Sequence, residues 1–423
     1  MPINQVSPVQ TAAQSFGGFQ VNVTSVGDTK PIPGAKITIS ITGEPNNKIG
    51  QLSTNEVGQT EKIELPAPAI DYSMEPSATQ PYSQYTILIE APGFLSVEVT
   101  GSQVFPEVTA LQPVHLMPVP ENSQKEGESF VIPANRLFGD FPPKIAEDEI
   151  KAVNETGEIV LSRVVIPEFV VVHNGPPRDK KAKDYYVRYR DYIKNVASSE
   201  IYATWPEASL IANILAIQSF TLNRVYTEWY RNKGYNFTIT SSTAYDHKFV
   251  PGRNVFANIS STVDTIFSKY LSRPNVKQPI LTQYCDGKQV SCPGWMTQWG
   301  SKYLADDGFT ASEIIKYYYG EDMYINESEE IAGIPSSWPG YDLSEGMSSD
   351  KIKQMQNQLN IISKGYPLVP KVAEDGIYGA QTKNSVEVFQ GIFGLPKTGV
   401  VDFPTWYKIS EIYVGVSRIA ELR

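Results

Sequence analysis

Glu207 is the strongest candidate for a chemical role in this sequence. It lies near the start of the run TWPEASLIANILAIQSFTLNRVYTEWY, and on a helical wheel it falls within the apolar stripe that includes Leu210 and Ile214. A carboxylic acid in an apolar surrounding keeps its proton available for acid–base chemistry. A structural role is also open, because Thr204 followed by Glu207 is a capping box and Pro206 fits the first helical turn. On these residues alone, the capping role is favoured.

Composition narrows the partners of the chain. Its 423 residues include 46 acidic and 36 basic side chains, so the net charge is -10, and its 24 tyrosines outnumber every other aromatic residue. We therefore expect no nucleic acid partner, since a polyanion is held by basic surfaces. Aromatic-rich acidic surfaces suit neutral polymers, of which sugars are the obvious case. No apolar run approaches the roughly 18 residues of a membrane span, and MPINQVSPVQ lacks the features of a signal peptide.

The N-terminal part alternates apolar and polar residues, as in FQVNVTSV, AKITISITG and YTILIEAPG. Turn-forming residues separate these runs, so residues 1–118 predict an antiparallel β-sandwich of about seven strands after a flexible lead. Residues 119–163 are polar and proline-punctuated, which indicates a linker with one short helix, and exposed segments of this kind are where proteases cut.

The remaining sequence predicts two further domains. Helical periods mixed with short strands indicate an α+β domain over residues 164–335. The polar run SSWPGYDLSEGMSS (336–349) is a second linker, and residues 350–423 predict a small helical domain. The chain is therefore predicted to be multidomain, and no repeat is evident within it.

The last segment carries a dense set of glycine, aromatic and polar residues. These are Asp375-Gly376, Tyr378-Gly379, Thr382, Phe389-Gln390, Gly394-Leu395, Thr398-Gly399-Val400-Val401-Asp402 and Thr405-Trp406. They resemble the peptidoglycan-binding type 1 domain, and the resemblance implies that peptidoglycan is a partner of this chain. Leu359, Val386, Phe389 and Leu395 are expected in the core of this domain. Tyr378, Gln381 and Gln390 are candidate ligand contacts, with a solvent-exposed role equally open.

The middle segment resembles the stage II sporulation D family. The features that carry this are TWPE with its long helix, YC-x6-C, the TQWG turn and the closing YYYG. That family cuts peptidoglycan glycan strands, and a glutamate at the start of this helix is its proposed acid/base. Here Thr297 replaces the serine of the turn, an extra Trp is present, and the helix register differs by one residue. The resemblance shifts the balance for Glu207 from capping to catalysis.

Nearly the whole chain resembles one branch, the clostridial spore cortex-lytic enzymes of the SleC type. The segments on which this resemblance rests are, in order, the sandwich, VIPEFVVVHNGPP, TWPE, VYTEWY, ITSSTAYDHKFVPGR and the wall-binding tail. The sandwich itself resembles transthyretin-like or carboxypeptidase-regulatory-like domains. These resemblances imply a zymogen located in the spore cortex or coat region, with a pro-region over residues 1–118 and activation by a protease that cuts within residues 119–163. The implied activity is a lytic transglycosylase acting in germination, in which the 6-hydroxyl of the sugar attacks and no second carboxylate is needed.

Hydrolysis would instead require a second carboxylate, for which Asp246 is the candidate. A turn-forming role for Asp246 is the alternative and is favoured. Tyr245, Tyr284, Gln298 and Trp299 are candidates to line a sugar groove, although aromatic residues are more often core. Two classes of non-enzymatic function stay open: a wall-binding protein that enhances a separate amidase, and a structural or phage-tail wall protein.

Cys285 and Cys292 enclose six residues. They could form a disulfide, stay reduced, or bind zinc together with His247, and zinc is the least favoured of these because it needs three or four ligands at tight spacing. We expect no cofactor.

Overall fold

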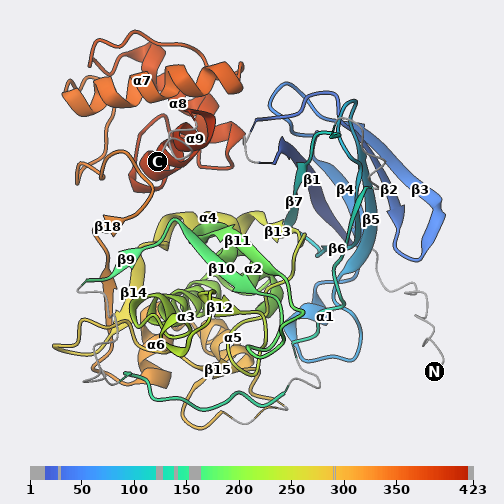
Figure 1. Cartoon of the computed structure of the whole chain (residues 1–423), viewed down its shortest axis with the longest axis vertical. Coiled ribbons are helices and arrows are strands. Elements are labelled where there is room, and N and C mark those ends of the chain that lie inside the picture. Colours follow the sequence, from blue (N-terminus) through green and yellow to red (C-terminus); the bar gives the residue numbers. More distant parts are fainter. Residues whose placement is uncertain are drawn as a thin grey trace.

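The computed structural model describes residues 15–26, 30–120, 127–137, 142–151, 163–288, 290 and 292–417. Figure 1 shows three regions: two β-sheets built mostly from the N-terminal part, a mixed helical and strand region from the middle, and a helical region at the C-terminal end. None of the helices in these ranges is both long enough and apolar enough to cross a membrane.

Two sheets share one hydrophobic core in the N-terminal region. One sheet has the order β3-β2-β5-β6-β8 and the other the order β13-β7-β1-β4. Their strands are β1 (Ser15–Ser25), β2 (Lys36–Ile41), β3 (Glu44–Ser53), β4 (Ile63–Ala67), β5 (Ser83–Glu90), β6 (Val97–Val104), β7 (Thr109–Leu116), β8 (Glu128–Val131) and β13 (Val255–Phe256). Alternate residues such as Phe19, Val21 and Ile37 are fully buried, as the period of two predicts.

Two features of these sheets differ from the sequence prediction. β1 pairs with β7 in parallel, and β6 pairs with β8 in parallel, so an entirely antiparallel arrangement was wrong. The sheets also draw on other parts of the chain, because β8 lies within the predicted linker and β13 belongs to the middle region. Next to β13, the Asn254 amide donates to the Gln103 carbonyl oxygen at 2.9 Å and its Oδ1 accepts from the Gln103 N–H at 2.9 Å. The two N-terminal sheets therefore include strands from outside residues 1–118.

The middle region is organised around one helix, α3 (Glu207–Tyr226). Its other elements are α2 (Tyr189–Glu200), α4 (Ala257–Ile266), α5 (Gln298–Asp306), α6 (Ala311–Tyr319) and η1 (Arg231–Lys233), with the strands β9 (Val165–Ile166), β10 (Phe169–His173), β11 (Asp184–Arg188), β12 (Ile239–Thr240), β14 (Lys269–Ser272), β15 (Tyr284–Cys285), β16 (Met296–Thr297), β17 (Tyr324–Glu327) and β18 (Glu330–Ile331). All residues of α3 are buried except Glu207, Ala208, Ile211 and Val225. The helix is therefore enclosed by the region on nearly every side, which fixes its position.

The predicted apolar stripe of α3 does not place Glu207 in a buried apolar surrounding. Glu207 does share a helix face with Ile211, but this face is the least buried one. The polar residues Gln218, Ser219 and Asn223 are fully buried instead, where each bonds to main-chain oxygens of the neighbouring segments. A helical wheel that places polar residues on the exposed face would therefore put Gln218, Ser219 and Asn223 on the wrong side of α3.

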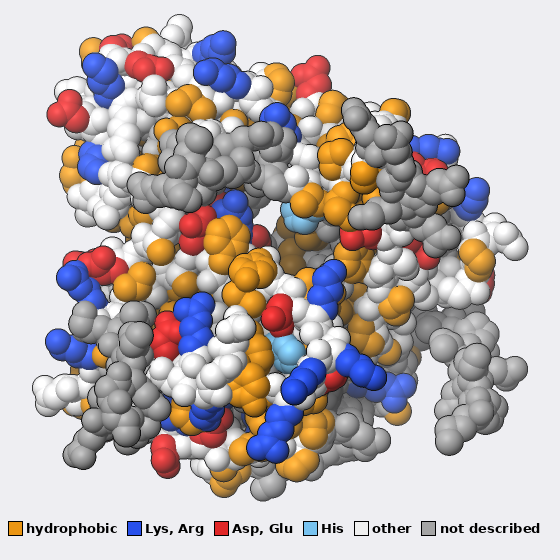
Figure 2. All heavy atoms as spheres, in the orientation of Figure 1, with side chains coloured by type: hydrophobic (Ala, Val, Ile, Leu, Met, Phe, Trp, Pro, Cys, Tyr) orange, Lys and Arg blue, Asp and Glu red, His pale blue; other side chains and the backbone are white. Residues whose placement is uncertain are grey.

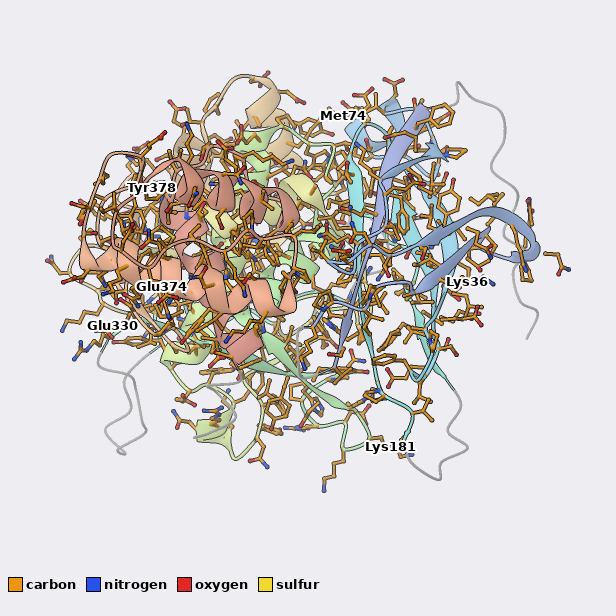
Figure 3. All side chains as sticks on the ribbon, turned by 90° about the horizontal axis from the view of Figure 1, so that it is seen from above. Lys36, Met74, Lys181, Glu330, Glu374 and Tyr378 are labelled. Carbon is orange, nitrogen blue, oxygen red and sulfur yellow. A yellow bond between two sulfur atoms is a disulfide. The ribbon has the colours of Figure 1, made fainter. Side chains whose placement is uncertain are left out.

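The C-terminal region consists of α7 (Asp350–Gly365), α8 (Ala380–Ile392) and α9 (Phe403–Ser417). The hydroxyl of Ser349 caps α7 by accepting from the Ile352 N–H at 3.2 Å. Seen from above, Tyr378 and Glu374 of this region lie over the middle region, and Lys36, at the start of β2, lies in the N-terminal region beside it (Figure 3).

A buried ionic cluster joins the C-terminal region to the middle region. Asp264 of α4 lies 2.8 Å from the Lys194 amine, 3.1 Å from the Arg190 guanidinium and 3.6 Å from the amine of Lys408, which belongs to α9. Arg190 and Lys408 also pair with Glu411 of α9. Burial alone would raise the pKa of Asp264, but the three cations outweigh it and hold that pKa well below its usual range. One carboxylate thus binds two regions together.

Replacing Asp264 with asparagine should destabilise the protein by about 3–5 kcal/mol, because it leaves buried cations without their counter-ion. The Asp264 pKa is lowered on folding, so its contribution is present above the unfolded pKa of about 3.9 and is lost as the pH falls through the folded value. Acid should therefore weaken the native protein more than the Asp264→Asn variant. Urea unfolding at pH 7 and at pH 2.5, below the unfolded pKa, measures both effects, with Asp307→Asn as an exposed control; a variant as stable as the native protein would contradict this assignment.

Candidate functional site

Glu207 begins α3 and its side chain is exposed. The predicted capping box is wrong, since Pro206 is the N-cap residue and no side chain caps the helix. Thr204 instead donates its hydroxyl to the Ser73 Oγ at 2.7 Å. Ser73 belongs to the short helix α1 (Asp71–Met74) of the N-terminal region, and its carbonyl oxygen also accepts from the Trp205 indole at 2.9 Å. The start of α3 is therefore in direct contact with the N-terminal region, and the Glu207 side chain does not cap the helix.

An aromatic cluster lies immediately before Glu207 in the chain and extends under α5. The rings of Trp205 and Trp299 are 4.9 Å apart, and Tyr303 lies 6.3 Å from Trp299. The Tyr303 hydroxyl donates to Glu75 of the N-terminal region at 3.1 Å. Trp299, a predicted groove residue, is almost fully buried, and its indole donates to the Leu137 carbonyl oxygen at 3.1 Å. In this structure Trp299 therefore packs between segments and does not present an exposed ring.

Two other predicted groove residues converge on a carboxylate that sequence reasoning missed. The Tyr284 hydroxyl donates to Oε2 of Glu200, and the Gln298 side chain donates to the Glu200 carbonyl oxygen at 2.8 Å. The Lys248 N–H donates to Oε1 of Glu200 at 2.6 Å. Glu200 is the last residue of α2 and is only 6% exposed. In the sequence it stands in VASSEIY, where no spacing or motif marks it.

Glu200 lines a pocket together with Asn135, Lys144, Tyr284, Lys248 and Gln298. Burial lowers the pKa of Lys144, and burial together with the nearby Arg253 lowers the pKa of Lys248 to about 8. The Lys248 amine donates to Oδ1 of Asn135 at 2.8 Å. The pocket thus contains two carboxylates, Glu200 and Asp286, and two amines beside apolar side chains, and it can hold hydrogen-bonding groups of a ligand.

Asp246 is held on all sides, which corrects its predicted place in a substrate site. It is fully buried, and its Oδ1 accepts from the Arg224 guanidinium at 2.7 Å. Its Oδ2 accepts from the Tyr230 hydroxyl at 2.5 Å and from the Thr240 N–H and hydroxyl at 3.0 and 2.7 Å. A carboxylate with these four donors anchors the fold and cannot activate water. Tyr245 beside it is partly exposed.

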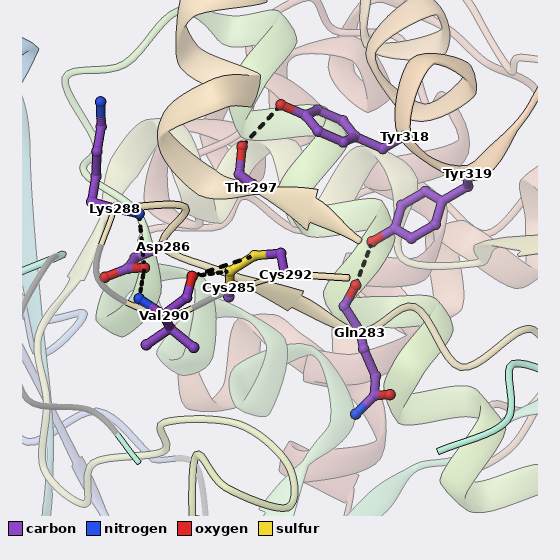
Figure 4. Close-up of a disulfide and its surroundings, with 9 residues drawn as sticks. All are labelled: Gln283, Cys285, Asp286, Lys288, Val290, Cys292, Thr297, Tyr318 and Tyr319. Carbon is purple, nitrogen blue, oxygen red and sulfur yellow. Dashed lines mark hydrogen bonds between the residues drawn. A yellow bond between two sulfur atoms is a disulfide. The ribbon is translucent and has the colours of Figure 1, made fainter. Parts of the chain in front are cut away.

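Cys285 and Cys292 form a disulfide, one of the alternatives that the sequence left open. The loop that it closes is shaped by Asp286, whose Oδ1 accepts from the N–H groups of Lys288 and Val290 at 3.1 and 3.0 Å (Figure 4). His247 is fully buried and bonds to the Tyr192 hydroxyl through Nδ1 at 3.0 Å. The zinc alternative loses two of its three ligands to the disulfide. Within the described ranges, no group of three or more His, Cys, Asp or Glu is arranged to hold a metal ion.

The candidate contacts of the C-terminal region differ in exposure. Tyr378 and Gln390 are fully buried, and the Tyr378 hydroxyl donates to the Gly399 carbonyl oxygen at 2.9 Å. The Gln390 amide donates to the Val400 carbonyl oxygen at 2.8 Å, and its Oε1 accepts from the Gly399 N–H at 2.9 Å. Neither side chain faces a ligand, so both predictions of contact are corrected. Gln381 is exposed at the start of α8 and is still available.

The two bonds that Gln390 makes to the loop at Gly399 and Val400 have a counterpart on the preceding helix. The Gln356 amide of α7 donates to the Ile377 carbonyl oxygen at 2.9 Å, and its Oε1 accepts from the Gly376 N–H at 2.8 Å. Both loops require a left-handed glycine, with φ of 75° at Gly376 and 65° at Gly399. This region therefore contains two copies of one glutamine–glycine loop, a repeat that sequence reasoning missed.

Comparison with known proteins identifies one part of the chain. Residues 348–409 match the family model described as a putative peptidoglycan binding domain. The prediction of this domain is thereby confirmed, and the domain supports peptidoglycan as a partner and a cell-wall-associated role. No curated protein matches the chain.

Solved structures add no argument on fold or function. A mercury-inhibited catechol 1,2-dioxygenase from an Acinetobacter species has a TM-score of 0.18 at 12% identity, covering 28% of this chain and 59% of that one. A 3-chlorocatechol 1,2-dioxygenase from Rhodococcus opacus has a TM-score of 0.17 at 12% identity, covering 25% of this chain and 61% of that one. The chain thus spans about three fifths of the length of these structures.

The different exposure of the two glutamines predicts separable effects. Gln390→Ala should lower stability by roughly 2–4 kcal/mol, because it removes a buried side chain, leaves the Gly399 N–H without its acceptor and takes one donor from the Val400 carbonyl oxygen. Gln381→Ala should leave stability unchanged and weaken sedimentation with purified peptidoglycan. Thermal unfolding and wall co-sedimentation of both variants measure this. A stable Gln390→Ala protein that no longer sediments would return Gln390 to the ligand contacts.

Proposed function

We propose that this protein is a peptidoglycan-degrading enzyme of the spore cortex, which holds the wall with residues 350–423 and cuts glycan strands with the middle region during germination. The match to a peptidoglycan-binding domain carries the proposal, because that domain is fixed to the middle region through the buried Asp264 cluster. A fixed binding domain presents one surface of the middle region to the wall. The face in Figure 2 has both signs of charge interspersed, which suits an uncharged polymer better than a polyanion.

Glu207 is the proposed acid. Breaking a glycosidic bond requires a proton on the leaving oxygen, and Glu207 is an exposed carboxyl at the start of a helix that is otherwise enclosed. A rigid helix holds the carboxyl in one place relative to the substrate. The burial of Asp246 favours a lytic transglycosylase over a hydrolase, since the candidate second carboxylate is used by Arg224. In a transglycosylase the carboxyl of Glu207 gives its proton to the leaving oxygen as the glycosidic bond breaks. The sugar's 6-hydroxyl then attacks the anomeric carbon and gives its own proton to the Glu207 carboxylate, so that an anhydro end results and the acid is restored.

The proposal includes synthesis as a zymogen. Its N-terminal region would act as the pro-region, of the transthyretin-like or carboxypeptidase-regulatory-like class, and a protease would cut within residues 119–163. The contacts of Ser73 with Thr204 and Trp205 support this, because they place the N-terminal region beside Glu207. A non-enzymatic peptidoglycan binder that enhances an amidase is the rival function.

Mass spectrometry of the fragments released from spore cortex and from vegetative wall tests the activity. Protein cut within residues 119–163 should release anhydro-muramic ends, and Glu207→Gln should release roughly 100-fold fewer or none, since a general acid contributes at least that factor. Glu321→Gln, an exposed glutamate of the same region, is the matched control.

Other fragment patterns would change the conclusion. Hydrated reducing ends would identify a hydrolase, and equal release by Glu207→Gln would remove Glu207 from the mechanism. No fragments from any form, together with stimulation of an added amidase, would establish the binding protein instead.

A further inference from the structure

The predicted linker is bound tightly to the middle region. We call residues 132–137 and 142–151 the strap. Its second part appears in Figure 1 as the teal trace along the lower edge of the middle region. It runs beside α3, because Leu137 contacts Tyr202 near the start of that helix and Glu147 contacts Arg224 near its end. The strap therefore covers one flank of the helix that begins with Glu207.

Two bidentate ion pairs hold the strap. The carboxylate of Glu147 accepts from the Arg224 guanidinium at 2.6 and 2.9 Å, and that of Glu149 accepts from the Arg273 guanidinium at 2.6 and 2.8 Å. The first pair is nearly enclosed, and the second is partly exposed. Water can therefore replace the partners of the Glu149–Arg273 pair much more easily than those of the Glu147–Arg224 pair.

The strap lies on a row of aromatic side chains. Lys144 holds its amine 4.9 Å from the centre of the Tyr284 ring and 5.7 Å from that of Phe220, and Lys151 holds its amine 4.5 Å from the Trp229 ring. At the other end, the Leu137 N–H donates to the Tyr202 hydroxyl at 3.2 Å, and its carbonyl oxygen accepts from Trp299. The covered surface is a series of ring faces and ring-borne polar groups.

Two buried glutamines form hydrogen bonds with the main chain of the strap. Gln283 accepts from the Glu147 N–H at 2.9 Å and donates to the Ile145 carbonyl oxygen at 2.7 Å. Gln278 accepts from the Lys151 N–H at 2.7 Å and donates to its carbonyl oxygen at 3.2 Å. Each glutamine thus offers one donor and one acceptor, which bond to two neighbouring amides of the strap. An N-acetyl group has both an amide N–H and a carbonyl oxygen, so it can bond to either the acceptor or the donor of such a glutamine.

We propose that the strap occupies the glycan-binding groove of the middle region, and that N-acetylated sugar rings take its place once the chain has been cut. The rings would lie against Trp229, Tyr284 and Trp299, with their acetamido groups on Gln278 and Gln283. Trp299 is also part of the aromatic cluster at Trp205, two residues before Glu207, so a groove along these rings would run toward Glu207. This inference rests on the proposed function, since it identifies the substrate subsites and the regulation of that enzyme.

The test measures binding and not catalysis. A recognition sequence for a specific protease is placed between residues 152 and 162 of the full chain, in a Glu207→Gln, Glu149→Gln background. A soluble hexamer of N-acetylglucosamine is then titrated into the uncut and the cut protein by calorimetry. Both forms contain the same C-terminal domain, so a difference between them reports the groove alone. Hydrogen exchange of residues 142–151 shows whether the strap has left.

The cut protein should bind the hexamer at least tenfold more tightly than the uncut protein, and residues 142–151 should lose their protection. Trp229→Ala should abolish this gain, whereas Tyr324→Ala, an exposed tyrosine outside the strap's contacts, should keep it. Equal affinity before and after cutting, or protection that persists in the cut chain, would overturn the inference. Tight binding by a cut chain whose Glu207 form releases no fragments would keep the inference and remove the enzymatic proposal.

Discussion

The fully buried guanidinium of Arg224 is the interaction on which the middle region depends. It donates through Nε to Asp246 and through both terminal nitrogens to Glu147, and it also donates to the Tyr245 carbonyl oxygen at 3.2 Å. A buried cation is tolerated only when its donors are used and its charge is balanced. Here the balance comes from two segments, the loop before His247 and the strap. Helix, loop and strap are therefore held by one charge.

The same physics joins the three regions into one body. Asp264 balances cations from α2 and α9, and Arg253 donates from the middle region to the Gln103 side chain of β6 at 2.7 Å. Strand β13 adds main-chain bonds to the N-terminal sheet. A chain that reads as three domains with linkers is thus built with shared strands and buried ion pairs.

Sequence reasoning succeeded where the physics is local. The glycine turns and amphipathic helices of residues 350–423 are short-range patterns, and the alternation of FQVNVTSV is a strand signal within one segment. It failed where a distant partner decides. Thr204 and Glu207 have the spacing of a capping box, but Thr204 is taken by Ser73, which lies 131 positions earlier. For Asp246 a turn-forming role was favoured over a catalytic one, yet its main partner, Arg224, could not be read from the turn.

The candidate site shows the same division. Tyr284 and Gln298 were chosen for their place in a motif-rich segment, and the structure does bring them together, but around Glu200. Glu200 ends a helix in an unremarked run, so only the fold reveals it. Glu207 stays exposed at the other side of Trp299, next to the contacts of α1. The exposed acid and the Glu200 pocket are linked through packed side chains, because Trp205 contacts Trp299 and the neighbouring Gln298 bonds to the Glu200 carbonyl oxygen. Under the proposed displacement, a polymer would reach both only after the strap has left.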